Sequence, residues 1–173
     1  MSVKSLKVVA VLSSVVVISS FVFGGMGCGN RTGEAEKDEI IADGPLPKGA
    51  FNARISIEYV PTSIKTDSSS IIKLRVKNLS NTVWPSKSLP GGEYAINLGD
   101  HWLDKNGSML IRDLDRSGLP RDVKPGEEVT MEINLTAPST PGNYILEYDM
   151  VQEAVTWFAR KGSKTSRVNV KVE

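Results

Sequence analysis

The sequence predicts an all-β domain, an antiparallel β-sandwich of about seven strands, and three observations carry this prediction. Apolar and polar residues alternate with a period of two through most of the chain after residue 50. Turn-forming Pro-Gly pairs, at 125–126 and 141–142, separate alternating segments. No segment in this part of the chain has apolar residues at a sustained helical spacing. Two packed antiparallel sheets bury the apolar faces of such strands.

Each expected strand places its apolar residues on one face. In chain order, the expected strands cover residues 53–59, 72–77, 94–103, 109–111, 129–135, 144–151 and 167–172. Asn106-Gly107 separates the third from the fourth and predicts a two-residue hairpin turn, because both central positions of that turn need positive φ.

Two aromatic residues make the expected sandwich immunoglobulin-like. Tyr144 follows Pro141-Gly142-Asn143 at the start of the penultimate strand, which suits a tyrosine corner. Trp102 is expected to be the central core tryptophan. Cys28 is the only cysteine, so no intramolecular disulfide is available and packing must hold the sheets together.

The N-terminus has the order of an export signal over residues 1–27. Lys4 and Lys7 precede an apolar run from Val8 to Val22, and small residues follow. The alternatives are simple secretion and an uncleaved anchor, since the run is just long enough to cross a bilayer.

Gly27-Cys28 after this run resembles the lipobox of bacterial lipoproteins. The resemblance implies that Cys28 is acylated, palmitate being a typical chain, and becomes the mature N-terminus, which anchors the protein to a membrane. Gly29 at the next position resembles the sorting pattern for the outer membrane, in a host that has one. We therefore expect an exported protein on the outer membrane or the periplasmic face of a Gram-negative envelope.

Residues 28–50 are expected to be a flexible tether, and residues 51–173 the folded domain. The tether is punctuated by Gly and Pro, carries the charged run 34–39, and has few apolar residues to offset the entropy of ordering.

Composition excludes several classes of function. The 21 basic and 20 acidic side chains nearly balance, so no nucleic-acid partner is expected. With one cysteine and one histidine, His101, we expect no metal site and no cofactor. No nucleophile motif accompanies His101, which is interpreted as a structural or surface residue.

Three segments suggest a family: Val83-Trp84-Pro85, His101-Trp102-Leu103-Asp104, and Asp149–Glu153 with Trp157-Phe158. With the Pro-Gly turns, they resemble Ig-like modules appended to bacterial glycosyltransferases and methyltransferases in surface-polysaccharide gene neighbourhoods. There is a weaker likeness to the four-tryptophan Ig-like domain of autophagy receptors, which binds protein partners. Both resemblances imply an accessory module without chemistry of its own.

The candidate binding residues are loop aromatics with two polar neighbours. Trp84, Trp157 and Phe158 lie in expected loops, where they could join Asp100 and His101 in a platform for a glycan or a partner protein. The alternative is that both tryptophans cap the ends of the core.

Three functions are therefore open. The first is a non-catalytic envelope lipoprotein that binds a surface glycan or an envelope protein. The second is a structural or assembly lipoprotein with no soluble ligand. A glycan-active enzyme is the least favoured, because Glu147, Asp149 and Glu153, which share one strand face, are expected to form a solvated salt-bridge face with Arg167 and Lys171.

Overall fold

The computed structural model describes residues 40–173, without the side chains of residues 112–114. The export signal, Cys28 and the first part of the expected tether lie outside the described residues. Between residues 40 and 173, no helix is long and apolar enough to cross a membrane.

The described chain is almost entirely strand. The elements in chain order are β1 (Ile41–Ala42), β2 (Ala53–Tyr59), β3 (Ser63–Ile64), β4 (Ser69–Asn78), β5 (Lys87–Ser88), β6 (Ile96–Leu103), β7 (Met109–Gly118), β8 (Glu128–Thr136), β9 (Gly142–Gln152), β10 (Thr156–Trp157), the 3-10 helix η1 (Phe158–Lys161) and β11 (Ser166–Val172).

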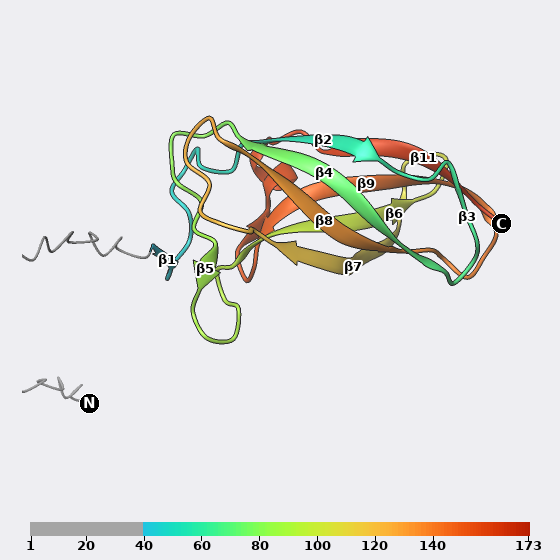
Figure 1. The fold of residues 1–173 in the computed structure, drawn as a ribbon, viewed down its shortest axis with the longest axis horizontal. Helices are drawn as coiled ribbons and strands as arrows, with labels where there is room; N and C mark the ends of the chain where they lie inside the picture. Colours follow the sequence, from blue (N-terminus) through green and yellow to red (C-terminus); the bar gives the residue numbers. More distant parts are fainter. Residues whose placement is uncertain (1–39) are drawn as a thin grey trace, which may run out of the picture. The chain divides into compact units, whose positions relative to one another are not determined.

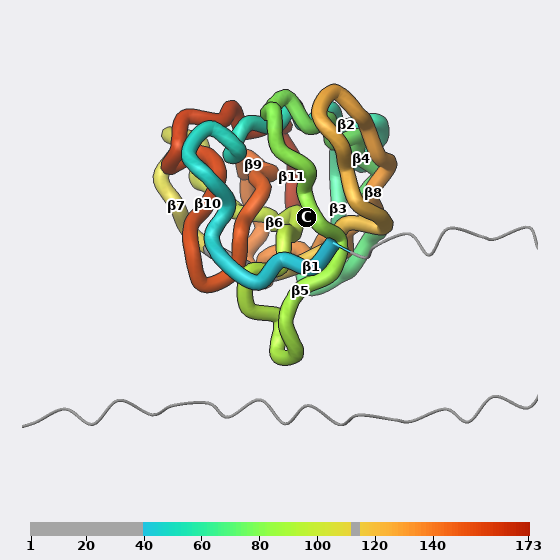
Figure 2. Tube along the Cα trace, turned by 90° about the vertical axis from the view of Figure 1, so that its left-hand side faces the viewer, coloured from blue at the N-terminus to red at the C-terminus, as the bar shows by residue number. Residues whose placement is uncertain are grey.

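The strands form two facing sheets (Figures 1 and 2). One sheet has the antiparallel order β2-β4-β8. The other has the order β3-β11-β9-β6-β7, and β10 pairs with the end of β9. The seven strands of seven or more residues within residues 40–173 coincide with the seven expected segments, so the predicted all-β sandwich is confirmed.

Inward-facing residues of both sheets form one core. Trp102 is fully buried there, and its indole N–H donates to the Thr136 carbonyl at 3.1 Å. The Tyr144 ring packs edge-on against Trp102 at 5.7 Å. The Tyr144 hydroxyl donates to the Thr140 carbonyl at 2.7 Å, which is the hydrogen bond of a tyrosine corner.

The turn between β6 and β7 differs from the expected two-residue form. Only Gly107 has a positive φ, 85°, whereas the expected turn needs a positive value at Asn106 as well. The Asp104 carboxylate accepts hydrogen bonds from the backbone N–H groups of Asn106 and Ser108, each at 2.8 Å. This side-chain cap supports a longer turn in which only one residue must be left-handed.

The folded domain begins about ten residues earlier than expected. β1 pairs in parallel with β5, and Ala42 and Ala50 are buried. The buried Gln152 accepts a hydrogen bond from the Leu46 N–H at 2.8 Å and donates to the Gly44 carbonyl at 3.0 Å. The backbone of residues 40–50 is therefore held by pairing with β5 and by the Gln152 side chain, contacts that the alternation of residues does not reveal.

Candidate functional site

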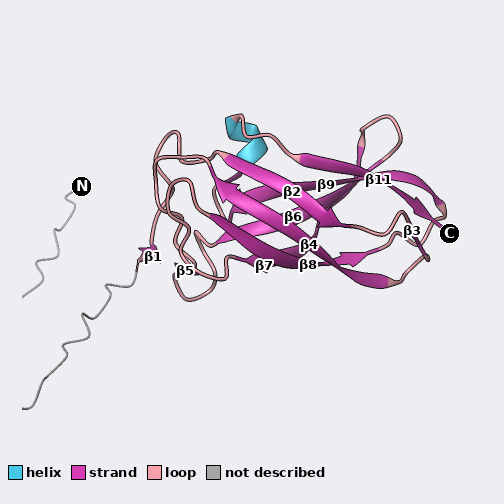
Figure 3. Cartoon of the chain, turned by 45° about the horizontal axis from the view of Figure 1, so that its top comes forward, coloured by secondary structure: helices cyan, strands magenta, loops and turns pink. Residues whose placement is uncertain are grey.

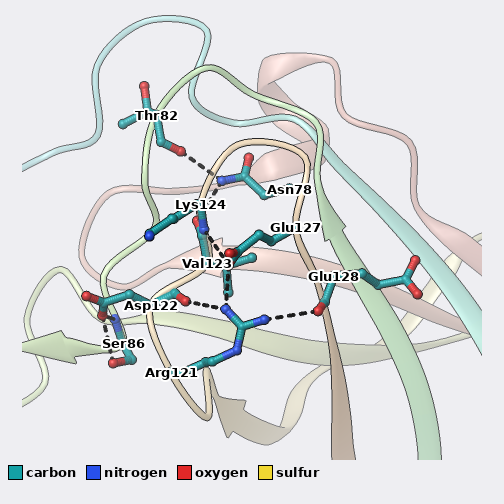
Figure 4. A network of polar contacts seen from close by, with 9 residues as sticks. All are labelled: Asn78, Thr82, Ser86, Arg121, Asp122, Val123, Lys124, Glu127 and Glu128. Atoms are coloured by element: carbon teal, nitrogen blue, oxygen red, sulfur yellow. Dashed lines mark hydrogen bonds and ion pairs between the residues drawn. The ribbon is translucent and has the colours of Figure 1, made fainter.

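Trp84 lies inside the sandwich, at the end that carries β1 and β5. The Asn78 side chain holds its loop by donating to the carbonyls of Thr82 and Val123, at 2.8 and 2.9 Å (Figure 4). The backbone of Trp84 pairs with Val123. Its indole N–H donates to the Ala50 carbonyl at 2.9 Å, and the side chain is fully buried.

Phe158 completes the same aromatic cluster. It opens η1, is fully buried, and packs edge-on against Phe51 and Trp84 with ring centroids 5.1 and 5.3 Å apart. The expectation that Trp84 and Phe158 line a surface platform is therefore wrong. These buried rings close this end of the core.

Asp100 is also absent from the surface. Successive residues of a strand point to opposite faces, and on β6 Asp100 points inward while Gly99 and His101 point outward. Its Oδ1 accepts a hydrogen bond from the Asp115 N–H at 2.8 Å. Burial raises the pKa of the Asp100 carboxyl to about 6. The expected convergence of Asp100 with His101 on one platform is wrong, because neighbours on one strand cannot share a face.

Trp157 and His101 do come together, on the outer face of the larger sheet. The ring centroids lie 4.3 Å apart, and Trp157 stays partly exposed. The guanidinium of Arg116 lies over the same indole at 4.5 Å. η1 follows Trp157 directly and lies near the start of β2 (Figure 3). Trp157 thus joins the β10–η1 segment to the outside of the sheet instead of capping the core.

A hollow of about 220 Å³ opens beside this contact. We call it the outer-face pocket. The polar and aromatic side chains that line it include His101, Glu147, Asp149, Trp157, Arg160 and Arg167. In the cross-strand register, Glu147 stands between His101 of β6 and Arg167 of β11. The pocket therefore combines an aromatic edge, two carboxylates and two guanidinium groups.

The two carboxylates are buried at the floor of this pocket. Glu147 Oε1 accepts hydrogen bonds from Arg167 Nε and the Thr165 hydroxyl, each at 2.7 Å. Asp149 accepts hydrogen bonds from the backbone N–H groups of Met150 at 2.8 Å and Ala159 at 3.0 Å. Burial raises the pKa of Asp149 to about 6, and these hydrogen bonds only partly oppose the rise.

The expected solvated salt-bridge face is therefore only partly correct. The Glu147–Arg167 ion pair exists, but Glu147 and Asp149 are 5% and 2% exposed because the β10–η1 segment covers the strand. Glu153 instead forms an ion pair with Arg116 at 3.1 Å and accepts a hydrogen bond from the Asn97 side chain at 2.8 Å.

Sequence reasoning missed the residues that give the pocket its shape. Gly99 leaves space for the Trp157 ring, and a lone glycine in a strand pattern is a signal of close approach. The sequence around Arg160 does not predict that this residue lines the pocket, because its position depends on how η1 packs. Among residues 40–173, no group of three His, Cys, Asp or Glu side chains is placed to hold a metal ion.

The two sheets and the tyrosine corner define an immunoglobulin-like β-sandwich, a class of domain that is typically non-catalytic. The model of the family "Ig-like domain from next to BRCA1 gene" matches residues 61–168. This match covers more than half of the chain, which therefore belongs to that family.

Solved structures match this chain at low identity and with TM-scores below 0.5. The CARDB domain of PF1109 from Pyrococcus furiosus is 16% identical in its solution structure, with a TM-score of 0.43 over 70% of this chain and 94% of that one. Its crystal form with di-metal ions is 15% identical, with a TM-score of 0.41, and the match covers 70% of this chain and 86% of that one. A β-glucosidase from Listeria innocua in complex with laminaribiose is 13% identical, with a TM-score of 0.42 over 70% of this chain and 16% of the enzyme. No curated protein matches the chain.

Proposed function

We propose that this protein is an exported, lipid-anchored binding module that holds a glycan of the cell envelope in the outer-face pocket. The anchoring rests on the export-signal pattern and on Cys28, and the ligand class rests on the chemistry of the pocket.

The observation that carries the proposal is the pair of buried carboxylates beside a partly exposed tryptophan. Burying Glu147 and Asp149 costs free energy that an apolar pair would not. Sugar hydroxyls both donate and accept hydrogen bonds, so a saccharide site needs acceptors and donors side by side. Glu147 supplies acceptors, Arg160 and Arg167 supply donors, and Trp157 supplies apolar contact.

The same geometry argues against catalysis. Both oxygens of Asp149 accept backbone hydrogen bonds, and Glu147 is tied to Arg167 and Thr165. A glycosidase needs one carboxyl free to give up a proton and a second free to act as a base or nucleophile. Asp149 is instead bonded to η1 through the Ala159 N–H, and Glu147 is bonded to Thr165 and Arg167.

A protein partner is the second candidate, and one observation favours it. Met109 and Leu110 at the start of β7 are exposed, and Met109 also lines the outer-face pocket. Apolar side chains at the rim of a polar pocket suit a protein segment better than a sugar.

The test measures binding of envelope polysaccharide fragments to residues 38–173, which form one compact unit with its own core. Titration calorimetry compares the wild-type domain with Arg160→Ala and His101→Ala. Loss of a charged hydrogen bond at Arg160 should weaken binding about tenfold or more. Lys73→Ala, on the outer face of the other sheet, is the matched control and should leave binding unchanged.

A structural role predicts a different result. The domain would then bind no fragment, and the two pocket variants would change only the free energy of unfolding. Binding of an envelope protein that is lost in Leu110→Ala but kept in Arg160→Ala would favour the protein partner.

A further inference from the structure

The chain from Ala154 to Val172 carries positive charge alone. It contains Arg160, Lys161, Lys164, Arg167 and Lys171, and neither aspartate nor glutamate. Residues 68–92 also carry cations alone, but there Lys73 and Arg75, on the outer face of β4, pair with glutamates of neighbouring strands. The segment is therefore a local concentration of positive charge in a nearly neutral protein.

Most of this charge is not neutralised within the folded domain. Arg167 pairs with Glu147, and Lys171 pairs with Glu173. Within residues 40–173, Arg160, Lys161 and Lys164 make no ion pair, and all three side chains are exposed. These three cations are concentrated in η1 and the loop that follows it.

A fourth cation meets this loop from the other sheet. Arg54 lies on β2, and its cross-strand neighbour on β4 is Lys77, another cation. Like charges that face each other directly across strands are destabilising. Arg54 also makes no ion pair within the described part of the chain. Lys77 also faces Glu128 on β8, whereas Arg54 has no acidic neighbour in the strand register given for β2 and β4.

Arg54 and Lys164 line one groove of about 450 Å³. We call it the basic groove; Asn52, Leu79, Gly162 and Thr165 contribute to its lining, and among the described residues no carboxylate does. Asn52 and Thr165 add an amide and a hydroxyl to the two cations. The groove therefore offers hydrogen-bond donors and positive charge in one place.

The groove is built on a fixed backbone. Ser163 Oγ accepts a hydrogen bond from the Ala53 N–H at 3.0 Å and donates to the Ala53 carbonyl at 3.4 Å. Ser163 is buried, and Gly162 before it turns the chain with a φ of 96°. This contact attaches the loop to the edge of β2 and sets the residues next to it, Arg54 and Lys164, on the two sides of the groove.

We propose that the basic groove binds the anionic groups, carboxylate or phosphate, of an envelope polysaccharide. A guanidinium matches either group with two parallel hydrogen bonds, and an ammonium adds a point charge. A bound anion relieves the repulsion between Arg54 and Lys77 and neutralises Lys164. The inference rests on the proposed glycan-binding function. It concerns a different site, and it specifies that the glycan is anionic.

The test uses oligogalacturonate as the anionic probe and its methyl ester as the neutral one, with residues 38–173 as the protein. The domain should bind the acid, bind the ester at least tenfold more weakly, and lose affinity for the acid as salt is raised. Arg54→Ala with Lys164→Ala should weaken binding of the acid at least tenfold. Lys73→Ala with Lys105→Ala removes the same charge elsewhere and should have little effect.

Three results would overturn the proposal. They are equal binding of acid and ester, binding that the Arg54/Lys164 double variant leaves unchanged, and binding to phosphatidylglycerol vesicles in place of the oligosaccharide. If the acid and neutral fragments both bind and only outer-face pocket variants reduce either binding, the basic groove proposal fails while the proposed function stands. If the acid binds through Arg54 and Lys164 while Arg160→Ala and His101→Ala change nothing, the groove stands and the pocket assignment fails.

Discussion

The indole of Trp157 occupies the space in which any side chain at Gly99 would begin. A β-carbon at residue 99 would lie 2.7 Å from Cη2 and 3.0 Å from Cζ3 of that ring. Gly99 has no left-handed φ, so its backbone would accept another residue without strain. Glycine is therefore required at this position because of the ring above it, and Trp157 in turn positions His101 and the β10–η1 segment.

Gly99→Ala should displace Trp157 from the sheet. The Arg116 Nη1 atom lies 2.6 Å from the same β-carbon position, but it is the end of a flexible side chain and can move. The indole cannot move without lifting β10. We expect a loss of about 1–3 kcal/mol in the free energy of unfolding, as for other overpacked sites, measured by urea denaturation.

The matched control is Gly118→Ala, where the nearest atom to the new β-carbon would be 3.6 Å away. It should cost less than Gly99→Ala. Equal costs, with unchanged tryptophan fluorescence in Gly99→Ala, would mean that Trp157 does not rest on Gly99.

The three tryptophans should differ in what they contribute to stability. Trp102 and Trp84 are fully buried and each donates an indole hydrogen bond, so replacement by alanine should cost about 3–5 kcal/mol. Trp157→Ala should cost clearly less, because its ring is partly exposed on the outside of the sheet. Urea denaturation of the three variants gives the ranking, and a cost under about 1 kcal/mol for Trp102 would contradict its place in the core.

The features that the sequence predicts correctly follow from strand alternation and local turn chemistry. The seven long strands, the buried Trp102 and the Tyr144 hydroxyl bond all depend on which face a residue takes and on the turn before it. The sequence also groups His101 with Trp157, but it does not predict that the two rings meet on the outer face of the sheet.

The misplaced residues depend on contacts between distant segments. Trp84 is buried because Asn78 and Val123 fold its loop inward, and those partners lie far apart in sequence. Asp100 shows a different limit: alternation places it inward, but a charged residue is expected to avoid the core. Its burial is compatible with the Asp115 hydrogen bond, which only the fold reveals.

Membrane anchoring should depend on Cys28. If this residue is acylated, Cys28→Ser should release the protein from the membrane fraction or leave an unprocessed precursor of lower mobility. Fractionation and gel electrophoresis of the full chain in its host measure both. Membrane association and mobility that both stay unchanged would contradict the lipid anchor, without affecting either proposed binding site.

The buried Asp100 should make the protein less stable as pH rises. The pKa of Asp100 is about 6 in the folded state, against an ordinary value of 3.8, so the folded state binds the proton more tightly. The contribution of this group to stability is therefore highest below pH 3.8 and falls as pH rises through 6. An asparagine side chain at this position would keep an acceptor for the Asp115 N–H but could not ionise. Asp100→Asn should thus gain about 1–3 kcal/mol relative to wild type between about pH 4 and pH 7.

Two controls isolate this effect. Asp149 titrates in the same direction and remains in both proteins, so only the difference between wild type and variant is compared. Asp104→Asn should behave in the opposite way, because hydrogen bonds from Ser108 and Asn106 hold the pKa of Asp104 below its usual value. Wild type is then favoured over Asp104→Asn as pH rises, and the advantage disappears in acid.

Thermal unfolding from about pH 3.5 to pH 8 measures wild type, Asp100→Asn and Asp104→Asn side by side. The stability difference between Asp100→Asn and wild type should grow as pH rises, because only the wild-type carboxyl must ionise inside the fold. A difference that does not change with pH would mean that Asp100 is ionised in the folded state throughout this range. Its buried carboxylate would then be stabilised by more than the Asp115 hydrogen bond.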